Sequence, residues 1–116
     1  MTAVTLYHNP RCSKSRATLA LLEEKNIDAE IVEYLSQPLD AAQLKAIAVK
    51  LGVSVRDIIR TGEDAYKELN LSDETLNDED LLAALEQHPI LMQRPIVVKG
   101  DEARVGRPPE SVLEIL

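Results

Sequence analysis

The hydrophobic pattern of the first third of the chain predicts a strand, a helix and a second strand. Residues 3–7 (AVTLY) and 30–34 (EIVEY) are short runs of aliphatic and β-branched residues, which is typical of strands. Between them, the segment SKSRATLALLEEKN carries Leu19, Ala20 and Leu22 at helical spacing. Two strands joined by one helix form a βαβ unit, so we expect parallel strands and a right-handed connection.

The middle of the chain predicts only helices. Asp40 can cap a helix that ends at Gly52, and Ser54 can cap the short segment VRDII. Two more helices are expected at 64–69 and 77–88. The first turn of the second one is acidic, which suits the positive end of the helix dipole.

The last part of the chain predicts a hairpin and a final helix. In RPIVVKGDEARVGRPPE, IVV and ARV read as strands and KGD as the turn. Pro108 or Pro109 then opens the helix ESVLEIL. The order β-α-β, helices, β-β-α is that of an α/β, thioredoxin-like (glutaredoxin-like) fold with a mixed sheet. We therefore expect a single domain over 1–116 with a helical insertion at about 40–88.

Composition narrows the class of protein. The 116 residues are 45% apolar and include no Trp or Phe, so the core must be aliphatic. The net charge of -7 argues against nucleic-acid and anionic-membrane binding. No apolar run approaches the roughly 18 residues of a membrane span. The N-terminus also lacks a secretory pattern, so we expect a cytoplasmic protein.

The charge is unevenly distributed. Residues 1–22 hold three basic residues and no acid, whereas the rest of the chain holds ten basic and twenty acidic residues. A local basic site on an acidic body indicates a small anionic ligand rather than a polymer. The segment 72–86 holds six acids and no base, and we interpret it as a solvated helix face.

The local basic charge surrounds the only cysteine, Cys12. One cysteine forms neither an internal disulfide nor a Cys-rich metal site, so any redox partner thiol comes from another molecule. At the start of the predicted first helix, unpaired backbone N–H groups and the helix dipole favour the thiolate. Ser13 and Ser15 can donate hydrogen bonds to sulfur or to an oxyanion. The basic or potentially basic residues around it are His8, Arg11, Lys14 and Arg16.

Several interpretations of this loop are open. A lone cysteine is often buried and structural, but the polar flanks HNPR and SKS argue against that here. Lys14 and Arg16 taken singly fit a solvated helix face, and His8 fits capping or packing as well as tuning of the thiol. The phosphatase pattern C-x5-R fails because Thr18 occupies the arginine position. The one-thiol glutaredoxin pattern C-x-x-S is present, and cysteine-based oxyanion reduction is the third possibility.

Four segments together resemble the glutathione- and glutaredoxin-dependent arsenate reductase (ArsC) family. They occur in order and span nearly the whole chain: YHNPRCSKSR at 7–16, IIRTGEDAYKELNL at 58–71, RPIVV at 94–98 and RVGRPPE at 104–110. The resemblance implies a thioredoxin-like domain with a helical insertion, as the order of elements does.

The resemblance also implies roles for seven residues. Cys12 matches the nucleophile that attacks arsenic, and three arginines match those around the oxyanion. His8 matches a histidine that helps to lower the thiol pKa, and Ser15 matches a residue that hydrogen-bonds the thiolate. Pro95 matches the cis-proline opposite the cysteine. The three arginines are Arg60, Arg94 and Arg107.

The implied reaction uses external thiols. Arsenate, or a similar oxyanion, is attacked by Cys12; glutathione, as a co-substrate, then forms a mixed disulfide, and glutaredoxin regenerates the cysteine. No bound cofactor and no metal are expected, and nothing in the sequence demands more than a monomer.

Two other functions remain open. One is a monothiol glutaredoxin-like thiol oxidoreductase. The other is a non-catalytic Spx-like regulator that binds RNA polymerase, for which the acidic segment 72–86 is the candidate surface. Redox-switched regulators of that kind carry C-x-x-C, and this chain has Asn9 at the first cysteine position.

Overall fold

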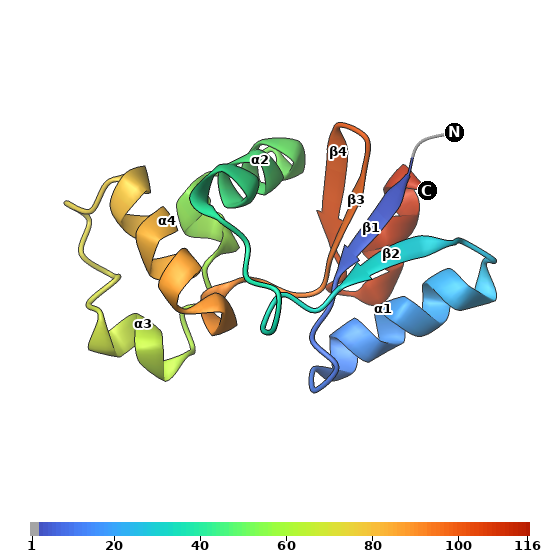
Figure 1. Ribbon diagram of the computed structural model, residues 1–116, viewed down its shortest axis with the longest axis horizontal. Coiled ribbons are helices and arrows are strands. Elements are labelled where there is room, and N and C mark those ends of the chain that lie inside the picture. The colour runs from blue at the N-terminus through green and yellow to red at the C-terminus, as the bar shows by residue number, and fades with distance from the viewer. Residues whose placement is uncertain (1–2) are drawn as a thin grey trace. The chain divides into compact units, whose positions relative to one another are not determined.

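The computed structural model of the chain describes residues 3–116, which form two compact units. The first unit contains the described residues up to Gln37 and those from Arg94 to Leu116, and the second runs from Pro38 to Gln93. Figure 1 labels the α-helices and strands of both units. The helical segment expected at about 40–88 lies within the second unit.

The first unit is built on a four-stranded mixed sheet with the strand order β2-β1-β3-β4. β1 (Val4–Tyr7) runs parallel to β2 (Ala29–Val32), and α1 (Ser13–Glu24) connects them. On its other side β1 pairs antiparallel with β3 (Ile96–Lys99), which pairs antiparallel with β4 (Glu102–Val105). The predicted α/β class, with its βαβ and ββα halves, is confirmed.

The strand register brings three chain segments to one edge of this sheet. Tyr7 at the end of β1 is opposite Ile96 at the start of β3, and Ile96 is opposite Val105 at the end of β4. The residues that follow β1, precede β3 and follow β4 therefore meet at that edge, although they are distant in sequence.

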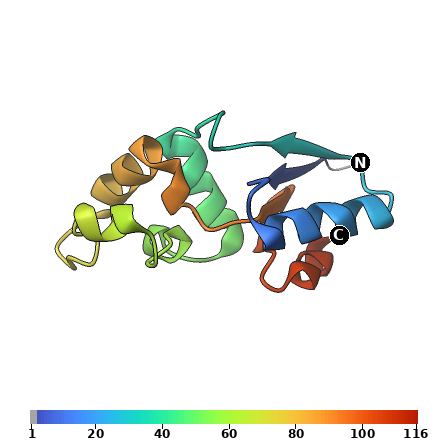
Figure 2. The same cartoon turned by 90° about the horizontal axis from the view of Figure 1, so that it is seen from below.

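α1 and the 3-10 helix η3 (Pro109–Ile115) pack against the same face of the sheet, as Figure 2 shows. The buried cluster between them is aliphatic and consists of Val4, Leu6, Leu22, Val97 and Val112. The last helix, expected over ESVLEIL, is 3-10 rather than α and runs from Pro109 to Ile115. Val112 and Ile115 both pack on the core, and a spacing of three residues puts them on one side of a 3-10 helix.

α1 buries only part of the face that its apolar residues predict. Leu22 is buried, but Ala20 is exposed and Leu19 is only partly buried. The other two buried positions, Ser15 and Thr18, lie on the same side of the helix as Leu22: Ser15 precedes Thr18 by three residues, and Thr18 precedes Leu22 by four. Both hydroxyls find partners: that of Thr18 donates to the Lys14 carbonyl at 2.9 Å, and that of Ser15 belongs to the loop described below.

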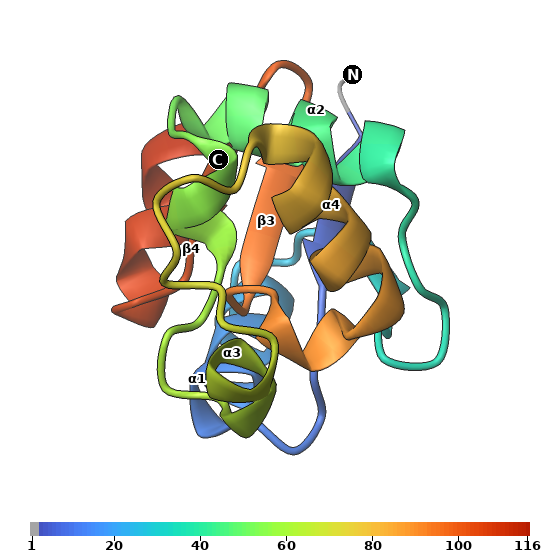
Figure 3. The ribbon, with the colours of Figure 1, turned by 90° about the vertical axis from the view of Figure 1, so that its left-hand side faces the viewer.

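All described helices and strands of the second unit are helices, and Figure 3 shows this unit in front. Asp40 caps α2 as predicted, because its side chain accepts from Gln43 N while the Gln43 side chain accepts from Asp40 N. Gly52 ends α2 with a φ of 73°, a left-handed conformation that favours glycine. The elements are α2 (Ala41–Leu51), η1 (Val55–Ile58), α3 (Asp64–Glu68), α4 (Asp78–Gln87) and η2 (Pro89–Leu91).

Within residues 3–116, no helix has both the length and the apolar character needed to cross a bilayer.

Candidate active site

Cys12 lies between β1 and α1, at the sheet edge where the three segments meet. Its backbone N–H donates to the Asn9 carbonyl at 3.0 Å, which closes the loop NPRC into a turn. Cys12 has an extended backbone and is the N-cap residue of α1, and its thiol is partly exposed. The sulfur therefore occupies the place of a capping oxygen, next to the unpaired N–H groups of the first helical turn.

A buried polar network behind the loop fixes this turn. The Ser15 hydroxyl lies 2.6 Å from His8 Nδ1 and accepts from the Asn9 N–H at 3.0 Å. The Asn9 side chain accepts from the Arg11 N–H at 3.0 Å. His8, Asn9 and Ser15 are 5%, 3% and 0% exposed, so protein groups replace water around them. The loop that carries the thiol is thus held by side chains on both sides of it.

Two arginines reach the sulfur from the other segments at this edge. Arg107, just after β4, directs Nη2 at Cys12 Sγ at 3.5 Å, and its Nε donates to the Arg94 carbonyl at 2.9 Å. Arg94 is largely buried, and its side chain also hydrogen-bonds the Cys12 sulfur. Strand register therefore joins these three residues across more than eighty positions of sequence.

These surroundings lower the pKa of the Cys12 thiol. The largest single influence, burial, raises the pKa, but four others act in the opposite direction and together exceed it. The backbone N–H groups of Ser15 and Lys14 stabilise the charged sulfur, as do the Arg94 side chain and the positive charge of Arg107. At neutral pH a larger fraction of Cys12 is therefore the nucleophilic thiolate than for a free cysteine.

The pKa of His8 is also lowered. Burial is the main cause, opposed by the negative charge of Glu33 and reinforced by the positive charge of Arg16. A neutral imidazole next to Ser15 contributes position rather than positive charge. The implied role of His8 in tuning the thiol remains a prediction; its ring is hydrogen-bonded to the Ser15 hydroxyl.

Gly106 allows the segments to come this close. Its N–H donates to the Pro95 carbonyl at 2.9 Å. A Cβ at this position would lie 2.5 Å from Thr18 Oγ1 and 2.7 Å from Pro95 Cγ, so no side chain fits without a shift. The Arg94–Pro95 peptide bond is cis. Glycine between β4 and Arg107 thus lets the arginine segment pack directly on α1 and Pro95.

Arg60 belongs to the second unit. Its backbone N–H donates to the Leu91 carbonyl at 2.7 Å, next to a bridge between Ile59 and Met92. Its Nε lies 3.3 Å from a Glu63 carboxylate oxygen. The convergence of Arg60 with the thiol and the other two arginines remains a prediction.

Two residues of the site were not identified from the sequence. Asn9 holds the loop through its N–H, its carbonyl and its side chain, and the dipeptide Asn-Pro is a local signal for such a turn. Gly106 has a weaker signal, a glycine between a strand and a proline pair, and its importance depends on tertiary contacts. The described residues contain no group of three or more His, Cys, Asp or Glu side chains that could hold a metal ion.

Both the sequence and the fold match known proteins. The ArsC family model matches residues 7–115. An arsenate reductase from Haemophilus influenzae is 50% identical, over 98% of this chain and 99% of that protein. The Escherichia coli protein YfgD, described as uncharacterized, is 54% identical over 97% of this chain and 96% of its own. The solved structure of an arsenate reductase from Vibrio cholerae superposes with a TM-score of 0.97 at 51% identity, covering 99% of this chain and 98% of that one.

The family model spans almost the whole chain, and relatives of equal length share about half of its residues. The thioredoxin-like fold predicted from the order of elements is that of these structures. The chain therefore belongs to the ArsC family.

Proposed function

We propose that the protein is an arsenate reductase in which Cys12 is the nucleophile. The observation that supports this most is the pair of guanidinium groups, Arg94 and Arg107, on the sulfur of a thiol with a lowered pKa. A thiolate and an oxyanion repel each other, and two arginines at the point of attack reduce that repulsion. Relatives named arsenate reductase share the fold and half of the sequence.

In the first step the Cys12 thiolate attacks arsenate. A sulfur–arsenic bond forms, and one arsenate oxygen leaves as water after taking up protons. Arsenic stays As(V) in this adduct. Arg107 is held by the Arg94 carbonyl and needs no reorientation to meet the developing charge. We expect Arg60 to contribute a third guanidinium to the oxyanion.

In the second step a glutathione thiolate attacks the Cys12 sulfur. The new disulfide bond forms as the sulfur–arsenic bond breaks, and the electron pair of that bond stays on arsenic, which becomes As(III) and leaves as arsenite. The chain has one cysteine, so the attacking thiol comes from another molecule. Glutaredoxin then exchanges with the mixed disulfide, taking the glutathionyl group and returning Cys12 to the thiol.

A coupled assay with arsenate, glutathione and glutaredoxin tests the proposal. The wild type should oxidise glutathione only when arsenate is present, and Cys12→Ser should not. Arg94→Ala should reduce the rate while leaving the protein folded. Turnover by Cys12→Ser would remove the cysteine from the mechanism.

The same assay separates the other functions. A folded wild type that ignores arsenate but reduces glutathione mixed disulfides with glutathione would instead be a monothiol glutaredoxin-like enzyme. A protein inactive in both reactions would favour a binding role.

A further inference from the structure

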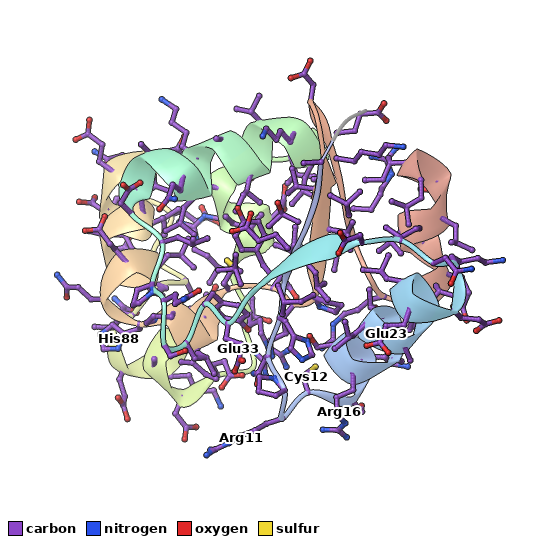
Figure 4. The ribbon with its side chains drawn as sticks, turned by 45° about the vertical axis from the view of Figure 1, so that its right-hand side comes forward. Arg11, Cys12, Arg16, Glu23, Glu33 and His88 are labelled. Atoms are coloured by element: carbon purple, nitrogen blue, oxygen red, sulfur yellow. The ribbon has the colours of Figure 1, made fainter. Side chains whose placement is uncertain are left out.

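Two arginines beside the thiol are not among the groups that activate it. Arg11 and Arg16 are exposed, and in the view of Figure 4 their side chains lie below the Cys12 sulfur, Arg11 to its left and Arg16 to its right. The main contributions that lower the Cys12 pKa come from backbone N–H groups, Arg94 and Arg107. Within residues 3–116, neither Arg11 nor Arg16 forms a salt bridge. Their positive charge is therefore available to a ligand.

Arg16 is held at the loop rather than extended into solvent. Its Nη1 donates to the Pro10 carbonyl at 3.0 Å, two residues before the cysteine, and its charge acts on His8. One N–H of the guanidinium is used in this contact, which leaves other donors free. The Arg11 backbone is fixed by the Asn9 side chain, so the residue next to the thiol has a defined position. A solvated arginine on an ordinary helix face needs no such anchoring.

We propose that Arg11 and Arg16 are the docking site for the carboxylates of the attacking thiol, glutathione. This inference rests on the proposed function, because it assigns a site to the co-substrate of that reaction. Glutathione carries its thiol in the middle residue and a carboxylate at each end, with a net negative charge at neutral pH. Two guanidinium groups on either side of Cys12 match that arrangement, because arginine binds carboxylates through paired N–H donors.

The site binds two different anions, the oxyanion next to the sulfur and glutathione farther out. Arg94 and Arg107 touch the sulfur and serve the oxyanion, whereas Arg11 and Arg16 lie outside it and serve the incoming peptide. An acidic protein otherwise repels an anionic co-substrate, since residues 23–116 carry twenty acids against ten basic residues. The absence of acids from residues 1–22 removes that repulsion where the thiol must approach.

Exchange with glutathione disulfide tests this site without arsenate. The Cys12 thiolate attacks one sulfur of the disulfide; a Cys12–glutathione bond forms, the original disulfide bond breaks, and the second glutathione leaves as a thiolate with the electron pair. The rate of mixed-disulfide formation is measured by mass spectrometry for the wild type, Arg11→Gln, Arg16→Gln and Lys25→Gln. Lys25 is exposed at the other end of α1 and is the matched control for loss of one positive charge.

Each arginine variant should react with glutathione disulfide about two- to fivefold more slowly at low salt, the size of an exposed ion pair. Added salt should reduce the difference. The rate with neutral hydroxyethyl disulfide, and the Cys12 pKa, should stay at wild-type values, and Lys25→Gln should match the wild type throughout.

Two results would overturn the docking site: unchanged rates with glutathione disulfide, or an equal loss with the neutral disulfide, which would mean that the arginines act on the thiol itself. Because no arsenate is involved, either result leaves the proposed reductase activity intact. Conversely, a lack of arsenate turnover would refute the proposed function without changing the rates of exchange with glutathione disulfide.

Discussion

The Ser15 hydroxyl is the hub of the network that holds the Cys12 loop, and Ser15→Ala removes it. The hydroxyl has two buried partners, His8 Nδ1 at 2.6 Å and the Asn9 N–H at 3.0 Å. Alanine leaves both without this partner at a position that is 0% exposed. Each buried polar group that loses its partner costs about 1–3 kcal/mol, so the free energy of unfolding should fall by about 2–6 kcal/mol. Only one oxygen atom is lost, so packing contributes little.

Urea unfolding with linear extrapolation measures this loss. Ser13→Ala is the matched control, because Ser13 is an exposed serine in the same helical turn, and its stability should change by less than about 0.5 kcal/mol. A second readout is the Cys12 pKa, which should rise in Ser15→Ala, because the Ser15 N–H that stabilises the thiolate is less firmly positioned. If Ser15→Ala and Ser13→Ala lose equally little stability, the network does not hold the loop.

Three further changes test other parts of the site. Arg107→Ala should raise the pKa of Cys12, followed by the ultraviolet absorbance of the thiolate, since it removes a charge and a donor 3.5 Å from the sulfur; an unshifted titration would contradict the contact. Gly106→Ala should lower the free energy of unfolding by about 1–3 kcal/mol through overpacking, whereas Gly62→Ala, whose Cβ meets no atom within 4 Å, should not. The pKa of His8 is lower in the folded than in the unfolded chain, so as the pH drops the unfolded chain takes up its proton first. The free energy of unfolding should therefore fall below about pH 6.5, and His8→Gln should show a smaller fall.

Local signals in the sequence were sufficient for the elements themselves. Asp40 and Gly52 bound α2 because a capping side chain and a left-handed glycine act within a few residues of each other. The KGD turn was likewise predictable from a local signal, because Gly100 between the two strands has a φ of 62°, a conformation that favours glycine. The exact kind of the last helix was not predictable, because residues three apart, such as Val112 and Ile115, lie on one side of an α-helix as well as of a 3-10 helix.

The site required information that local patterns do not hold. Hydrophobic spacing along α1 does not identify Ser15 and Thr18 as buried, because their hydroxyls are satisfied by groups outside any apolar pattern. The approach of Arg94 and Arg107 to Cys12 depends on the register that sets Tyr7 opposite Ile96, which no single segment specifies. The resemblance to a family identified Arg94 and Arg107 as candidate site residues, and their contacts with the Cys12 sulfur give the physical reason.

A single-turnover experiment tests the central claim most directly. The reduced protein is mixed with arsenate and glutathione without glutaredoxin, and arsenite and the protein mass are followed together. The mechanism predicts one arsenite and one glutathionyl group on Cys12 for each protein molecule, with neither formed when arsenate is omitted or Cys12 is replaced by Ser. Arsenite without the mixed disulfide, or neither product from a folded protein, would contradict it.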